Sequence, residues 1–167
     1  MSRQLFVDLD GVLADFDRHY RDLFGIDPRR VRHTKDRAEL DLFWDRIRQH
    51  GDFFSGMPMM RGARRLWTYC REMHPNPIIL TGVPHSIPGV EAQKRAWVAR
   101  HLTPRVEVIC CPSRDKCLHA RPGDVLIDDL ATFRDRWEAA GGIFLLFEGR
   151  VDATVREARL FFTRVFR

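Results

Sequence analysis

Five short apolar runs, separated by stretches with helical periodicity, constrain the fold of this chain more than any other feature. The runs cover residues 5–7, 77–80, 106–111, 125–127 and 143–147. No hairpin turn joins any two of them, and parallel strands need long crossover connections that are usually helical. The sequence therefore predicts an α/β fold, a doubly wound parallel sheet with helices covering both faces.

The first apolar run ends in two carboxylates, within the sequence Asp8-Leu9-Asp10-Gly11. Strand alternation predicts that Asp8 and Asp10 point to the same side. Like charges this close repel one another, and a hard cation such as Mg²⁺ offsets the repulsion because it favours carboxylate oxygens. Ligands also bind at the carboxyl ends of parallel strands. The pair indicates a magnesium site, and the alternative is a turn that closes an edge hairpin.

Two other runs also end in polar residues. The fourth run ends in Asp128-Asp129, and paired carboxylates on an otherwise buried strand are costly without a metal. The second run ends in Thr81-Gly82, where a hydroxyl and free N–H groups could bind an anion. By itself a Thr-Gly pair is more often simply a turn. We expect these strand ends to meet at one edge of the sheet.

Residues 16–60 carry no strand signal and form an insertion between the first two strands. The pattern predicts helices over residues 16–24 and 36–50, with a basic irregular segment over 29–35 between them. Residues 52–60 are rich in turn formers, aromatic residues and methionine. The domain organisation predicted is a core made of residues 1–15 and 61–167, interrupted by the insertion 16–60.

The charge and cysteine content narrow the class of protein. The chain has 167 residues and a formal net charge of +5, but its arginines are scattered. A surface that attracts small anions is therefore expected, and nucleic acid is not the expected partner. The four cysteines lack zinc-like spacing, which favours reduced thiols in a cytoplasmic protein. With no signal peptide and no apolar run near 18 residues, neither export nor a membrane span is expected.

The sequence Asp8-Leu9-Asp10-Gly11-Val12-Leu13-Ala14-Asp15 resembles the first motif of the haloacid-dehalogenase-like (HAD) phosphohydrolases. It is most similar to the 5'(3')-deoxyribonucleotidase branch. The resemblance implies a Rossmann-like core, with the insertion 16–60 as a helical cap that closes over the site. It also implies that Asp8 is the nucleophile and Asp10 the general acid/base, and that Asp8 belongs to a Mg²⁺ site to which Asp10 lends its backbone carbonyl.

The resemblance extends to three later motifs. It implies that Thr81 holds an oxygen of the transferring phosphoryl group, although the deoxyribonucleotidases follow this Thr with Ser and this chain has Gly82. Lys94, in Gln93-Lys94-Arg95-Ala96-Trp97-Val98, matches the motif whose cation neutralises the phosphate and the nucleophile. Without the resemblance, a helical lysine is expected in solvent. The final acids match the motif that completes the metal site, with Asp129 as direct ligand and Asp128 behind it.

The resemblance also suggests residues that contact the substrate. Phe53 and Phe54 match an aromatic cluster that lines a nucleobase pocket, although pattern alone leaves them as core of the cap. Arg114 and Lys116 lie in a similar Arg-Asp-Lys sequence near the substrate. Ser113, just before them, is expected to cap a short helix.

These features predict a Mg²⁺-dependent phosphomonoesterase that uses an aspartyl-phosphate intermediate. The expected partner is a small phosphomonoester, a nucleoside monophosphate in first place and a sugar phosphate or another small ester as the alternative. Two other interpretations of the function are a receiver-type phospho-acceptor and a non-catalytic nucleic-acid-binding protein. The sequence leaves a homodimer open.

Overall fold

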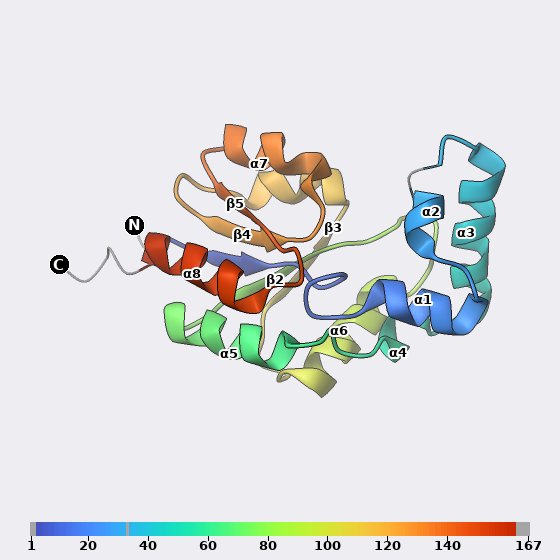
Figure 1. Cartoon of the computed structure of the whole chain (residues 1–167), viewed down its shortest axis with the longest axis horizontal. Helices are drawn as coiled ribbons and strands as arrows, with labels where there is room; N and C mark the ends of the chain where they lie inside the picture. The colour runs from blue at the N-terminus through green and yellow to red at the C-terminus, as the bar shows by residue number, and fades with distance from the viewer. Residues whose placement is uncertain (1–2, 33, 163–167) are drawn as a thin grey trace.

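The computed structural model describes residues 3–32 and 34–162 and contains one parallel five-stranded sheet (Figure 1). The strand order is β3-β2-β1-β4-β5. The strands are β1 (Leu5–Val7), β2 (Ile78–Gly82), β3 (Val108–Cys111), β4 (Val125–Asp128) and β5 (Ile143–Leu146). The chain runs outward from β1 to β3 and then returns to β1's other side, so the predicted doubly wound parallel sheet is confirmed.

Alternation along the strands divides the core into two layers. Leu5 and Val7 face a large apolar cluster, whereas Phe6 between them faces a smaller one with Trp137. On the first face lie helices α5 (Ala63–Met73), α6 (Val90–His101) and α8 (Val151–Phe162), and on the second lie α7 (Arg134–Ala139) and the 3₁₀-helix η1 (Ser113–His119). The central strand β1 is thus buried on both sides, which excludes the edge hairpin.

The insertion folds into helices α1 (Phe16–Phe24), α2 (Pro28–Arg32), α3 (Arg37–His50) and α4 (Phe53–Gly56). Figure 1 shows α1, α2 and α3 grouped beyond one end of the sheet, whereas α4 lies beside α6. Asp15 and Asp36 cap α1 and α3 through their side chains, which satisfies backbone N–H groups at the helix starts. The segment 29–35 is not irregular throughout, because Pro28 begins a helical turn, a position that suits proline.

Several boundaries differ from those predicted. The third strand begins at Val108 and not at Val106. The sequence pattern predicts one helix over residues 131–140, but this segment divides into a 3₁₀ turn, η2 (Ala131–Phe133), followed by α7. Ser113 does not cap a helix: it is the first residue of η1, after Pro112. The sequence pattern also predicts a closing helix over residues 152–166; α8 spans Val151–Phe162, and positions 163–166 of that prediction lie outside the described residues.

None of the four cysteines is joined in a disulfide in the structure. Burial raises the pKa of Cys70 to about 12, and that of Cys111 to about 11, so both stay protonated at neutral pH. In the part of the chain that the structure describes, no helix has both the length and the apolar character that crossing a bilayer requires.

Candidate active site

The predicted acids meet where β1 and β4 lie side by side. Val7 pairs with Ile127, and the backbone N–H of Asp8 donates to the carbonyl of Ile127 at 2.8 Å. This register brings Asp8, just after β1, next to Asp128, the last residue of β4. Between these two strands the winding of the sheet reverses direction, which is where open α/β sheets bind ligands.

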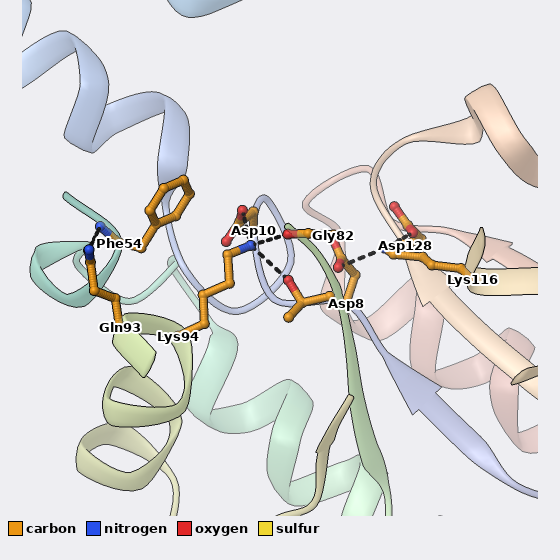
Figure 2. Close-up of polar contacts among 9 residues, drawn as sticks. Asp8, Asp10, Phe54, Gly82, Gln93, Lys94, Lys116 and Asp128 are labelled. Atoms are coloured by element: carbon orange, nitrogen blue, oxygen red, sulfur yellow. Dashed lines mark hydrogen bonds and ion pairs between the residues drawn. The ribbon is translucent and has the colours of Figure 1, made fainter. Parts of the chain in front are cut away.

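Lys116 joins Asp8 and Asp128. Its ammonium lies 2.8 Å from Asp8 Oδ1 and 2.7 Å from Asp128 Oδ2, and all three side chains are buried (Figure 2). Burial alone lowers the pKa of Lys116, but the two carboxylates outweigh that effect and raise it above its ordinary value. Burial and the neighbouring Asp8 raise the pKa of Asp128. Lys116, predicted to contact substrate, is therefore the direct ionic partner of the predicted nucleophile.

Lys94 is fully buried instead of solvated, and it binds the second aspartate of the motif. Its ammonium lies 2.7 Å from Asp10 Oδ2, 2.9 Å from Thr81 Oγ1 and 2.6 Å from the carbonyl oxygen of Gly82 (Figure 2). The resemblance implied that Lys94 lies next to the predicted nucleophile, Asp8, but the carboxylate that Lys94 contacts is that of Asp10. Burial raises the pKa of Asp10, although Lys94 opposes this effect.

Asp8 and Asp10 are bound by different lysines, Asp8 by Lys116 and Asp10 by Lys94. The expectation of strand alternation does not apply to Asp10, because β1 ends at Val7 and a turn follows in which Gly11 has φ +81°. Both carboxylates still line the same cavity. The site therefore presents two carboxylates in different environments, which is the arrangement that separates a nucleophile from a proton donor.

The three acids whose carboxylates are predicted to hold the metal come together, and the resemblance assigns Asp10 to the ion through its backbone carbonyl instead. Asp8, Asp128 and Asp129 each offer an oxygen within 4.8 Å of the others, whereas the Asp10 carboxylate is not in this group. A side chain on Gly11 would place its Cβ 2.1 Å from Asp129 Oδ2, so this glycine admits the Asp129 carboxylate. With every group ionised, the four acids and two lysines carry two net negative charges. The residues present therefore fit a divalent cation with oxygen ligands, such as Mg²⁺.

A cavity of about 280 Å³ opens above these carboxylates. From the insertion its wall includes Phe16, Trp44 and Phe54, and from the core it includes Gly82, Ser113 and Lys116 as well as an apolar end around Leu126, Phe133, Trp137 and Phe144. Thr81 and Lys94, predicted to bind phosphate, do not line it but lie directly behind Gly82, fully buried. Ser113 and Lys116, which line the cavity together with Asp8, are therefore accessible to a ligand there, whereas Thr81 and Lys94 are not.

The two phenylalanines of α4 occupy different places. Phe53 packs inside the aromatic cluster of the insertion, 5.1 Å from Phe16 and 4.8 Å from His19 between ring centroids. Phe54 lines the cavity, and Lys94 Nζ lies 5.0 Å from its ring centroid. The core interpretation therefore fits Phe53, and the substrate interpretation fits Phe54.

Arg114 lies away from the site. Its side chain is exposed and its closest acidic partner is Asp115, at 3.7 Å. In a 3₁₀-helix, residues three apart share a face. Lys116 is two positions from Arg114, so the turn that directs Lys116 inward directs Arg114 outward.

Sequence reasoning missed two residues that shape the site. Trp44 lines the cavity from α3. In the sequence it shares one helix face with Leu40 and Ile47, a spacing that indicates only a core position. Gln93 connects α6 to the insertion: its Oε1 accepts from Phe54 N at 2.9 Å, and its Nε2 donates to the Gly51 carbonyl at 2.8 Å (Figure 2). The position of Gln93 beside Lys94 was the signal available for it.

Comparison with protein-family models gives no match, and no curated protein matches the chain at a significant level. The case for a function therefore depends on the chemistry of the residues gathered around this cavity.

Proposed function

We propose that the protein is a Mg²⁺-dependent phosphomonoesterase that acts on nucleoside monophosphates through an aspartyl-phosphate intermediate. One observation carries this proposal. Asp8 and Asp10 face one cavity, and each is bound by its own buried lysine. Such a pair can divide nucleophilic attack and proton transfer between two carboxylates.

Asp8 acts as the nucleophile. Its carboxylate attacks phosphorus, the phosphorus–oxygen bond to the ester breaks, and the leaving alkoxide takes a proton. The ion pair with Lys116 at 2.8 Å holds the carboxylate in place at the wall of the cavity. Water then attacks phosphorus of the aspartyl-phosphate, which releases inorganic phosphate and restores the carboxylate of Asp8.

Asp10 carries the proton in both steps. Because burial raises the pKa of Asp10, its protonated form is favoured over that of an exposed aspartate, and it can give its proton to the leaving alkoxide. In the second step the resulting carboxylate takes a proton from the attacking water. Lys94, 2.7 Å from Oδ2, orients the group and limits the rise in its pKa.

Asp8, Asp128 and Asp129 would hold the magnesium ion, as their convergence within 4.8 Å supports. When bound, the ion offsets the negative charge shared by the carboxylates and the phosphate. Lys116, which lines the cavity, contributes a further positive charge near the equatorial oxygens of a phosphoryl group, where negative charge gathers. Lys94 adds a second positive charge from behind Gly82.

The lining of the cavity favours a nucleotide over a sugar phosphate. Phe16, Trp44 and Phe54 give the insertion side of the cavity aromatic faces on which a base can stack. A sugar would need hydrogen-bonding groups for its hydroxyls, because buried hydroxyls without partners are costly.

A phosphate-release screen over nucleoside monophosphates, sugar phosphates and p-nitrophenyl phosphate tests the proposal. Asp8→Asn should abolish turnover on every substrate cleaved while the melting temperature shows a folded protein, because an amide cannot form the phosphoenzyme. Asp115→Asn, an acid on the same segment as Lys116 but outside the cavity lining, is the matched control and should keep activity. Wild-type turnover by Asp8→Asn would refute the mechanism.

A further inference from the structure

Gly82 and Ser113 approach one another more closely than two side chains could. A Cβ built on Gly82 would lie 2.1 Å from Ser113 Oγ and 3.3 Å from Ser113 Cβ. The φ angle of Gly82 is not in the left-handed region, so backbone conformation does not require a glycine here. Instead, the hydroxyl of Ser113 occupies the space where a side chain at position 82 would lie, so a larger residue there would displace this hydroxyl.

The geometry of η1 directs Ser113 to the predicted phosphate site. Residues three apart in a 3₁₀-helix lie one above the other on the same face. Ser113 and Lys116 are three apart in η1, and Lys116 reaches Asp8 at 2.8 Å. Both residues line the cavity, together with Gly82 and Asp8.

The other hydroxyl at this strand end is already engaged. Thr81 is fully buried, and its Oγ1 accepts a hydrogen bond from Lys94 at 2.9 Å. It does not line the cavity, whereas Ser113 does. Of these two hydroxyls, Ser113 is therefore the one that a ligand above Asp8 can reach without rearrangement.

We propose that Ser113 is a phosphate-binding residue, whose hydroxyl donates a hydrogen bond to a non-bridging oxygen of the substrate phosphate. Because Gly82 has no side chain, there is room for this hydroxyl. The hydroxyl of Ser113, on η1, therefore lies where a side chain at position 82 of β2 would have been. The inference depends on the proposed phosphatase function and specifies a residue for it. A phosphate oxygen is charged, so this bond is stronger than one between neutral groups.

The test is the affinity of the protein for inorganic phosphate, measured by calorimetry in Mg²⁺ buffer and as competitive inhibition of hydrolysis. Ser113→Ala should weaken phosphate binding and lower kcat/KM by about tenfold to a hundredfold, the range that a hydrogen bond to a charged group gives. Ser86→Ala, which removes a hydroxyl from an exposed loop serine, is the matched control and should change neither quantity.

Exchange variants separate a binding role from a packing role. Gly82→Ser alone should lower the melting temperature and the activity, because its Cβ collides with Ser113 Oγ. Gly82→Ser with Ser113→Gly removes that collision and returns a hydroxyl from the strand. This double variant should bind phosphate at least tenfold more tightly than Ser113→Gly alone.

The outcomes distinguish the inference from the function it depends on. Unchanged phosphate affinity in Ser113→Ala, with wild-type hydrolysis intact, would overturn the role of Ser113 and leave the phosphatase proposal standing. A wild-type protein that neither binds phosphate nor hydrolyses any ester would overturn both. Loss of melting temperature in Ser113→Ala with unchanged phosphate affinity would assign Ser113 to packing alone.

Discussion

Asp8 Oδ1 and Lys116 Nζ lie 2.8 Å apart, although 108 positions separate them in the chain. The same ammonium lies 2.7 Å from Asp128 Oδ2. One lysine thus offsets two buried carboxylates that neighbouring strands bring together. Because Lys116 belongs to η1, this contact also fixes η1 over the strand ends, and with it the position of Ser113.

Lys116→Met should strongly destabilise the protein. Removing the ammonium leaves Asp8 and Asp128 buried without their cation, and breaking a buried ion pair in this way costs about 3–5 kcal/mol. Chemical denaturation in EDTA should show this loss. Adding Asp128→Asn to Lys116→Met should recover part of it, because one of the two unpaired charges is then gone.

The matched control is Lys35→Met, which makes the same change at an exposed lysine. Its free energy of unfolding should stay within about 0.5 kcal/mol of wild type. Equal stability of Lys35→Met and Lys116→Met would contradict the buried ionic contact.

Activity should require magnesium, and Gly11 should set the affinity for it. EDTA should abolish phosphate release, Mg²⁺ should restore it, and Ca²⁺, with a larger and looser coordination shell, should restore it poorly. Gly11→Ala places a methyl group 2.1 Å from Asp129 Oδ2, so this variant should need at least tenfold more Mg²⁺ for half-maximal activity.

Gly25→Ala controls for backbone strain. Gly25 has φ +70° and no heavy atom within 4 Å of a built Cβ. Both alanine variants should therefore lose about 1–2 kcal/mol of stability from the left-handed backbone, but only Gly11→Ala should change the magnesium requirement. Full activity in metal-free protein, verified by elemental analysis, would exclude a metal-dependent mechanism.

Phe54→Leu should weaken nucleotide binding selectively. Base–aromatic stacking contributes about 1–3 kcal/mol per base, so loss of the ring should raise KM for a nucleoside monophosphate roughly tenfold. Hydrolysis of p-nitrophenyl phosphate should change much less, because the carboxylates lie on the core. Steady-state kinetics on both substrates check this.

Phe53→Leu is the matched control, since both rings are equally buried but Phe53 does not line the cavity. It should lower the melting temperature and leave the ratio of nucleotide to p-nitrophenyl phosphate activity unchanged. Equal changes on both substrates in Phe54→Leu would remove the nucleotide from the proposal and keep the phosphatase.

The stability of the insertion should fall in mild acid because of His19. Burial and the neighbouring His50 lower the pKa of His19 from its ordinary value of 6.5, whereas a hydrogen bond with the backbone of Phe53 and the charges of Asp22 and Asp52 act in the opposite direction. A histidine with a lowered pKa in the fold binds its proton more readily when unfolded. Its contribution to stability is therefore complete above pH 6.5 and is lost as the pH falls below that value and through the lower pKa of the folded state.

His19→Phe removes the titrating group and keeps a ring against Phe53, 4.8 Å away. Between pH 8 and pH 5 the melting temperature should fall less in this variant than in wild type. Burial also lowers the pKa values of His74 and His101. Both residues remain in the two proteins, so their titration contributes equally to the pH dependence of both melting temperatures. Parallel curves for the two proteins would show that His19 does not contribute.

The strands and the convergence of their ends could be predicted from sequence because both depend on local pattern. An apolar run followed by an acid marks a buried strand and its carboxyl end, and parallel strands bring such ends to one edge. Asp8, Asp128 and Asp129 therefore lie where the pattern indicated.

The partners of the lysines could not be predicted, because a motif gives a position in the chain and no direction in space. Lys94 binds Asp10 and Lys116 binds Asp8. This choice of partners depends on the distances of α6 and η1 from β1, which are set by packing. The same limit applies to Phe53 and Phe54. Adjacent residues on a short helix point to different sides, and only packing decides which of them reaches the cavity.

The link between α6 and the insertion has a consequence for substrate entry. Gln93 holds Phe54 N and the Gly51 carbonyl, and Trp97 Nε1 donates to the Met57 carbonyl at 2.7 Å. Lys94 of the site lies on the same helix between them. The cavity wall formed by α4 is thus tied by hydrogen bonds to the helix that carries Lys94. A ligand that enters the cavity therefore meets Phe54 in a position that Gln93 fixes.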